Sequence, residues 1–232
     1  MSPIHVEFFF DPVCPFCWVT SQWVRNVARQ RPLAIAWRPL SLRILNEPIG
    51  YAGKPAAYPE AHQRGLEMLR VVAAARHSHG PDVVAVLYRA MGQAVWHAPP
   101  PEEASFEAIL AETARPRDLA AILEQAGLPR ELAAAAHDEG WDAELRTETE
   151  EAVTRAGGGV GTPILSFDPP DGPAFFGPVI HQAPDGEEAL RMWDAVTTLA
   201  HRPGFAELKR TLRAFPDTPM SARIAGHATR AG

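Results

Sequence analysis

Two cysteines separated by two residues, directly after an apolar run, constrain this sequence more than any other feature. Residues 6–10 are mostly apolar and predict a buried strand. After a turn, residues 14–31 predict an amphipathic helix that begins at Cys14 and carries Cys17 three positions later. Because three residues make nearly one helical turn, the two thiols can share one face at the start of this helix. The sequence therefore predicts a strand, a turn and a helix that opens with a dithiol.

The predicted position of the pair favours thiol chemistry. A thiolate at a helix N-terminus lies beside unpaired backbone N–H groups and the positive end of the helix dipole. This environment lowers a cysteine pKa from about 8.5 into roughly the 3.5–7.5 range. We expect Cys14, the outer and more exposed cysteine, to be the nucleophile, and Cys17, one turn further in, to be the resolving thiol. Pro15 falls in the first turn, where its missing N–H costs little.

A structural zinc site is the alternative for the same pair. Zinc takes four ligands in such sites, but these two are the only cysteines in the chain, and His77 and His79 have the wrong spacing for a zinc motif. The strand before the pair and the helix after it favour redox chemistry. We therefore expect no metal site, and a dithiol that cycles between reduced and oxidised forms.

Composition and patterning argue against several classes of partner. The 232-residue chain has a net charge of −6 at pH 7, which gives no electrostatic footprint for nucleic acid. The N-terminus lacks the features of a secretory signal, and no apolar run reaches the length of a membrane span. We therefore expect no nucleic-acid or membrane partner, and a cytoplasmic location, where thiols are kept reduced.

The hydrophobic pattern separates an α/β frame from a helical block. Residues 4–11 and 33–38 predict two strands joined by the first helix, a βαβ unit with a parallel pair. After the helical block, residues 163–167 and 174–176 predict a hairpin. The predicted helices of the block are 59–78, 81–92, 105–114, 117–126, 129–138 and 141–156, and those after the hairpin are 185–200 and a short one over 205–215.

Two short βα and ββα pieces that flank a helical insertion make up the thioredoxin fold in its DsbA-type layout. We therefore expect an α/β fold of this kind with a large all-helical insertion. The thioredoxin-like domain would be discontinuous, over residues 1–55 and 157–215, and the insertion domain would span residues 56–156. The C-terminal tail, residues 216–232, is polar and small, and we expect it to be weakly ordered.

At this point the motifs resemble those of a known family. Residues 11–18, which contain Cys14-Pro15-Phe16-Cys17, and the later residues 160–163 resemble the DsbA-family pairing of Cys-x-x-Cys with a cis-proline loop. More narrowly, the chain resembles the actinobacterial mycothiol-dependent nitroreductases. The segments that carry this likeness are residues 17–23, 41–47, 175–179 and 187–211. The resemblance covers almost the whole chain, and the combined motifs are specific although each alone is weak.

The resemblance implies a cis peptide before Pro163. Such a bond would present the backbone N–H and C=O of Thr162 beside the Cys14 sulfur, where an extended substrate or a thiol such as mycothiol could pair with them like an added strand. From the residues alone, an ordinary trans turn is the alternative, because cis is a minority state even before proline.

Further residues are candidates for binding substrate or thiol. Phe16 lies between the cysteines, where this family often has tryptophan, so stacking with an aromatic substrate could differ. Asn46 could bind a nitro group or the polar body of a thiol, or be a turn residue. His62 could line the same cleft, although its position alone favours a solvated face of a helix. For Asp11 we expect a cap on the first helix.

The resemblance implies a cytoplasmic thiol-disulfide oxidoreductase, in the form of a mycothiol-dependent reductase of nitro compounds or disulfides. Mycothiol would be the thiol co-substrate, and we expect no tightly bound cofactor, since no Gly-x-Gly-x-x-Gly follows a strand. The partners would be a low-molecular-weight thiol and a small-molecule or disulfide substrate, with a monomer or a homodimer both open. One alternative is a thiol transferase or isomerase of the kappa-class glutathione transferase branch, which lacks the second cysteine. The others are a non-catalytic thiol- or metal-binding module and a folding oxidase for exported proteins.

Overall fold

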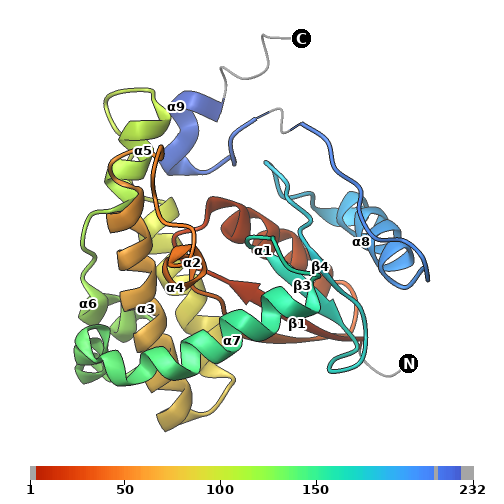
Figure 1. Cartoon of the computed structure of the whole chain (residues 1–232), viewed down its shortest axis with the longest axis horizontal. Coiled ribbons are helices and arrows are strands. Elements are labelled where there is room, and N and C mark those ends of the chain that lie inside the picture. Colours follow the sequence, from red (N-terminus) through yellow and green to blue (C-terminus); the bar gives the residue numbers. More distant parts are fainter. Residues whose placement is uncertain (1–3, 212–213, 226–232) are drawn as a thin grey trace.

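A four-stranded sheet forms the centre of the computed structural model, which describes residues 4–211 and 214–225 (Figure 1). The strand order is β2-β1-β3-β4, with β1 parallel to β2, and with β1–β3 and β3–β4 both antiparallel. The parallel pair is the predicted βαβ unit, and the antiparallel pair β3–β4 is the predicted hairpin. The strands are β1 (Ile4–Phe10), β2 (Leu33–Pro39), β3 (Ile164–Phe167) and β4 (Ala174–Phe176).

Helices cover both faces of this sheet. α1 (Pro15–Ala28) and α8 (Gly186–Ala200) pack together, and Trp23 of α1 meets Trp193 of α8 with ring centroids 5.5 Å apart. α7 (Asp142–Arg155) crosses the opposite face (Figure 1). Successive side chains of a strand point to opposite faces, so Phe8 joins the core with α1 while Phe9 packs with residues of α7.

The helical block lies between the second and third strands. Its longest helix, α3, spans 22 residues, and α4 reaches the sheet by stacking Tyr88 on Phe10 with ring centroids 3.8 Å apart. The remaining segments are short. The block contains α3 (Tyr58–His79), α4 (Val83–Trp96), α5 (Phe106–Thr113), α6 (Leu119–Gln125), the 3₁₀ segments η1 (Arg130–His137) and η2 (Glu139–Trp141), and α7.

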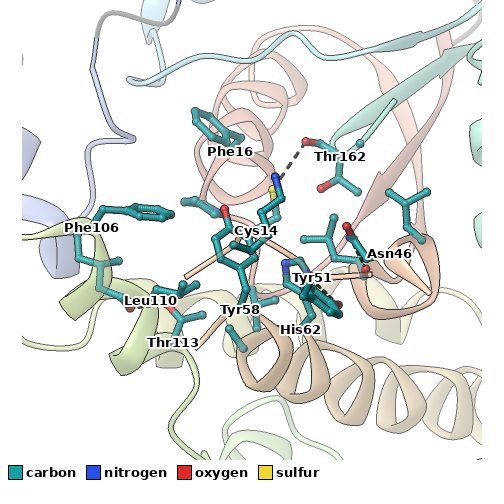
Figure 2. A pocket seen from close by; sticks show the side chains of 18 of the residues that line it. Cys14, Phe16, Asn46, Tyr51, Tyr58, His62, Phe106, Leu110, Thr113 and Thr162 are labelled. Carbon is teal, nitrogen blue, oxygen red and sulfur yellow. Dashed lines mark hydrogen bonds between the residues drawn. The ribbon is translucent and has the colours of Figure 1, made fainter. Parts of the chain in front are cut away.

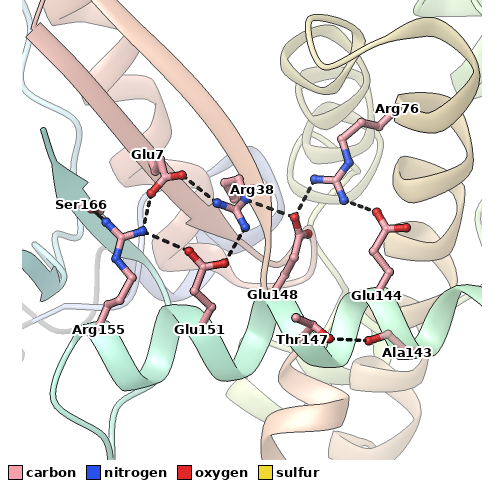
Figure 3. A network of polar contacts seen from close by, with 10 residues as sticks. All are labelled: Glu7, Arg38, Arg76, Ala143, Glu144, Thr147, Glu148, Glu151, Arg155 and Ser166. Atoms are coloured by element: carbon pink, nitrogen blue, oxygen red, sulfur yellow. Dashed lines mark hydrogen bonds and ion pairs between the residues drawn. The ribbon is translucent and has the colours of Figure 1, made fainter. Parts of the chain in front are cut away.

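A network of ion pairs joins the block to the sheet (Figure 3). Arg38 of β2 contacts Glu7 of β1 at 2.7 Å, and Glu148 and Glu151 of α7 at 3.1 and 2.9 Å. Glu148 also pairs with Arg76 of α3 at 2.8 Å. Because these groups are largely buried and paired, the network fixes α7 over the sheet.

The expected α/β fold with a helical insertion is confirmed, with local differences. The segment after β2 forms a short helix, α2 (Leu42–Asn46), which was not predicted, because five residues are too few for a periodic pattern. The helix predicted over residues 129–138 is the 3₁₀ segment η1. The division into a discontinuous domain and an insertion remains our proposal. Among the described residues, no helix combines the length and the apolar character of a membrane span.

The expectations for the C-terminal region need correction. Residues 205–211, 214 and 215 form no helix, although a short one was predicted there. Residues 216–221 are not loose either: η3 (Pro219–Ser221) buries Met220 completely and begins with a capping box between Thr218 and Ser221. α9 (Ala222–Ala225) follows, and residues 226–232 lie outside the described part. A small, polar tail thus gains order from one buried methionine and a helix cap.

Candidate active site

Cys14 is the N-cap residue of α1. Its backbone is extended (φ −85°, ψ 114°), and its Sγ accepts a hydrogen bond from the Cys17 backbone N–H at 3.3 Å. Both cysteines are free thiols. Cys17 is fully buried, whereas Cys14 is 5% exposed and lines a cavity. Cys14 is therefore the outer thiol and Cys17 the inner one.

The surroundings separate the acidities of the two thiols. Burial alone would raise the pKa of Cys14, but hydrogen bonds from the Cys17 thiol, the Thr162 side chain and the Cys17 backbone outweigh it and lower the pKa below 9.0. For Cys17, burial and then the hydrogen bond with Cys14 and its charge raise the pKa well above 9.0. Cys14 therefore becomes a thiolate first, and Cys17 keeps its proton.

The loop before β3 lies against Cys14. The Thr162–Pro163 peptide is cis, as the family resemblance implied. The Cys14 thiol donates to the Thr162 carbonyl with 3.8 Å between sulfur and oxygen (Figure 2). The Thr162 hydroxyl is also buried, and apart from the Cys14 sulfur it has no partner among the described residues, so it is free to donate to a Cys14 thiolate. Pro163 is buried behind this contact.

A cavity of about 520 Å³ opens in front of the Cys14 sulfur. Figure 2 shows Cys14 between two ends of it, with Asn46, Tyr51 and His62 on one side and Phe106, Leu110 and Thr113 on the other. Of the residues proposed from the sequence, those that line the cavity are Cys14, Pro15, Phe16, Asn46, His62 and Thr162, whereas Cys17 and Pro163 lie behind the wall.

Asn46 and His62 are held by contacts of their own. Asn46 ends α2, and its amide nitrogen donates to the Leu42 carbonyl at 2.7 Å. His62 is 7% exposed, so it is not on a solvated helix face, and its Nδ1 lies 3.0 Å from the Tyr51 hydroxyl. Burial, followed by the charge of Arg43, lowers the pKa of His62 to about 4. The imidazole is therefore neutral at pH 7.

Asp11 does not cap α1. Its two carboxyl oxygens accept from the backbone N–H groups of Val13 at 3.1 Å and Leu42 at 2.8 Å, so it ties the turn before Cys14 to the start of α2. The side chain is fully buried, and burial raises its pKa to about 7 although both hydrogen bonds lower it. The cap of α1 is Cys14 itself, three residues later.

The cavity residues that were not anticipated include Tyr51, Tyr58, Phe106, Thr113 and Phe215. One of them had a usable signal, because Tyr58 stands four residues before His62 and such pairs share a helix face. The others come from a loop, from α5 and from the C-terminal segment, and no local pattern relates those segments to the cysteines. Among the described residues, no group of three or more His, Cys, Asp or Glu side chains is arranged to hold a metal ion.

A thioredoxin-type sheet, a dithiol at the N-terminus of the first helix and a cis-proline beside it define a DsbA-like thiol oxidoreductase. A family model described as "Rv2466c-like: Mycothiol-dependent nitroreductase Rv2466c" matches residues 13–210. The chain belongs to this family and is an enzyme of the thiol oxidoreductase type.

Individual proteins are also similar to this chain. An uncharacterized protein, Rv2286c of Mycobacterium tuberculosis (strain ATCC 25618 / H37Rv), is 30% identical over 223 residues, which are 94% of this chain and 85% of that protein. Two solved structures each have a TM-score of 0.50 and show the fold. The cytosolic disulfide reductase DsbM from Pseudomonas aeruginosa is 14% identical, with 84% of this chain and all of that chain covered. A 2-hydroxychromene-2-carboxylate isomerase is 17% identical, with 84% and 94% covered.

Proposed function

We propose that Cys14 and Cys17 are the redox-active dithiol of a mycothiol-dependent reductase of nitro compounds or disulfides. The observation that carries this proposal is the Cys14 sulfur itself. It lies at a cavity wall and receives the Cys17 N–H at 3.3 Å, and its pKa is lowered while that of Cys17 is raised. A nucleophile and a resolving thiol need this difference.

With a disulfide substrate, the Cys14 thiolate attacks one sulfur, forms a mixed disulfide and releases the other sulfur as a thiolate. Cys17 then loses its proton and attacks the Cys14 sulfur, which forms the Cys14–Cys17 disulfide and releases the second thiolate. With a nitro compound, the two thiols supply two electrons and two protons, so that one oxygen leaves as water and a nitroso compound forms. Thr162 would position either substrate through its backbone groups, and Asn46 and His62 through their polar atoms.

Two molecules of mycothiol would restore the dithiol and become mycothiol disulfide. The body of mycothiol is rich in hydroxyl groups and has no carboxylate, whereas glutathione has two. Around the cavity, the described lining contains one basic side chain, the exposed Lys54, and no arginine, while amide, hydroxyl and imidazole groups are contributed by Asn46, Tyr51, Tyr58 and His62. This lining suits a neutral, polyhydroxylated thiol better than a dicarboxylate. A cytoplasmic location would supply that thiol.

The test is the reduction potential of the Cys14–Cys17 pair, measured in mycothiol and in glutathione redox buffers. We expect a reversible two-electron couple that equilibrates faster with mycothiol. Absence of an intramolecular disulfide across the accessible range would overturn the proposal and favour a transferase or a ligand-holding module. Faster equilibration with glutathione would overturn the choice of mycothiol while leaving the dithiol in place.

A further inference from the structure

The C-terminal segment contributes an aromatic side chain to the cavity. Phe215 lies beyond residues 13–210, which the family model matches, yet its ring lines the cavity between those of Phe16 and Phe106. The ring centroids are 6.4 Å from Phe16 and 5.9 Å from Phe106. One ring thus connects the segment between the cysteines with the far end of the helical block.

The residues that follow Phe215 fix its position from outside the cavity. The Asp217 backbone N–H donates to the His181 carbonyl at 2.6 Å. Met220 is completely buried, and the Ser221 hydroxyl donates to the Pro216 carbonyl at 2.5 Å. Arg223 donates to the Glu102 carbonyl at 2.7 Å, next to the start of α5. Because these contacts hold the chain on both the sheet side and the helical side, Phe215 is a defined wall of the cavity.

Phe215 completes a continuous row of rings. From Phe106 the row continues to Tyr58 at 6.1 Å and then to His62 at 5.2 Å. All these separations fall in the range that aromatic side chains prefer for tilted or edge contacts. At the Phe106 end the other labelled residues are Leu110 and Thr113, whereas Asn46, Tyr51 and His62 gather at the opposite end. The cavity therefore has an aromatic end and a polar end, with Cys14 between them.

We propose that Phe215 and Phe106 form a subsite for the planar aromatic ring of the electron acceptor, and that Phe215 selects for such acceptors. This rests on the proposed function, since it names the class of substrate that the dithiol reduces. A flat ring gains from offset or edge contacts with several aromatic neighbours, and a saturated ring of similar size gains only from burial. The polar end would hold the thiol co-substrate, so that both partners meet at the Cys14 sulfur.

Binding tests this subsite without any turnover. Calorimetry with reduced full-length protein would compare 2-naphthol, a planar probe without a nitro group, with decahydro-2-naphthol, its saturated analogue. We expect Phe215→Ala to weaken 2-naphthol binding about tenfold, as the loss of one or two ring contacts implies, and to weaken decahydro-2-naphthol binding less. Phe215→Leu keeps apolar volume without a ring and should lose the same preference for 2-naphthol.

The matched control is Phe205→Ala. Phe205 lies on the same C-terminal stretch, but its ring packs on Phe175 at 5.9 Å and does not line the cavity. We expect wild-type binding of both probes. Unchanged 2-naphthol affinity in Phe215→Leu, or an equal loss for both probes in Phe215→Ala, would overturn the subsite. If Phe215→Ala does not fold, Phe215→Leu decides alone.

The calorimetric test of the subsite is independent of the test of the proposed function. If the Cys14–Cys17 pair fails to exchange with mycothiol, the proposed function fails, but the calorimetric comparison still reports on the subsite. If exchange succeeds and the ring preference is absent, only the subsite fails. If both the exchange with mycothiol and the ring preference are observed, the ratio of kcat/KM for nitrobenzene to that for nitroethane should fall about tenfold in Phe215→Leu.

Discussion

The backbone N–H of Cys17 points at the sulfur of Cys14, with 3.3 Å between nitrogen and sulfur. This contact comes from the first turn of α1, so it persists whatever side chain stands at position 17. The Cys17 thiol adds a second hydrogen bond, which also lowers the pKa of Cys14. The two contributions can therefore be separated by substitution.

Replacement of Cys17 by alanine should raise the pKa of Cys14 without abolishing its reactivity. The thiol hydrogen bond is lost, whereas the backbone N–H remains. The ultraviolet absorbance of the thiolate, followed against pH, measures the pKa. Mass spectrometry after reaction with a small disulfide should show one stable adduct, since no resolving thiol remains. The control is Cys14→Ala, for which we expect no adduct, and rapid adduct formation by that variant would contradict the assigned roles.

The buried carboxyl of Asp11 should make the protein less stable as the pH rises. Its pKa is about 7 in the folded state against 3.8 ordinarily, so the folded state keeps a proton that the unfolded state has lost between these pH values. Stability from this group is present below about pH 4 and is lost as the pH rises through 7. Asp11→Asn should remove this contribution to stability. The slope of the unfolding free energy against pH should then change by about +1.4 kcal/mol per pH unit.

Chemical denaturation at several pH values between 4 and 7 gives these slopes. The control is Asp194→Asn, because Arg31 lowers the pKa of the exposed Asp194 and its titration falls below this window. Equal slopes for Asp11→Asn and the wild type would show that Asp11 is ionised throughout.

The neutral imidazole of His62 should have the opposite effect and make the protein more stable as the pH rises. Its folded pKa is about 4 against 6.5 ordinarily, so between these values the unfolded state binds a proton that the folded state does not. Stability from this group therefore rises with pH across the window. His62→Asn should change the slope by about −1.4 kcal/mol per unit in the same experiment. A slope change of the same sign as in Asp11→Asn would contradict the neutral imidazole.

Loss of Arg38 should destabilise the fold strongly. The side chains of Glu7 and Glu148 are only 12% and 11% exposed, and Arg38 pairs with both. Arg38→Met removes the partner that both carboxylates share, while Glu148 keeps Arg76 and Glu7 keeps Arg155. We therefore expect a loss of about 1.5–3 kcal/mol, the value of hydrogen bonds to charged groups, and not the larger cost of a buried charge left alone. Urea unfolding at pH 7 measures the loss. The control is Arg191→Met, which breaks a pair that is 67% and 82% exposed and should cost about 0–0.5 kcal/mol. A loss for Arg38→Met as small as the control's would argue against a buried network.

Gly92 should not tolerate even a methyl group. A Cβ at this position of α4 would clash with the indole ring of Trp18, the residue after Cys17. Alanine favours helix by about 1 kcal/mol over glycine, but forced repacking of a dense core costs about 1–3 kcal/mol. We therefore expect Gly92→Ala to lower the unfolding free energy and the reactivity of Cys14 together. The neighbouring Gln93→Ala serves as the control for helix propensity, and a more stable Gly92→Ala would contradict the close contact.

Local rules predict the frame of the site well. The strand that ends at Phe10, the dithiol that opens α1 and the hairpin after the Gly-rich stretch all follow from patterns within a few residues of one another. The cis-proline needed the family likeness, because no local rule requires that isomer at Pro163.

Local rules do not predict the walls of the cavity. Tyr51 and Phe106 come from separate segments, and only tertiary packing places them near Cys14. The two errors about burial have the same origin. His62 and Met220 lie in polar surroundings in the sequence, but Tyr51 contacts His62 from the preceding loop, and α4 contacts the segment that carries Met220. Sequence periodicity indicates which face of a helix or strand is apolar. It does not indicate which segment covers a face that carries both polar and apolar residues.

The contact between Cys14 and Thr162 spans 148 residues of chain, and β1 cannot pair with β3 until both have been made. During synthesis the dithiol segment and the whole helical block leave the ribosome before the loop that covers the thiols. A long closure of this kind also slows the last step of folding. For that interval the nascent chain carries two uncovered cysteines, and a reducing environment or a chaperone must protect them until the proline loop arrives.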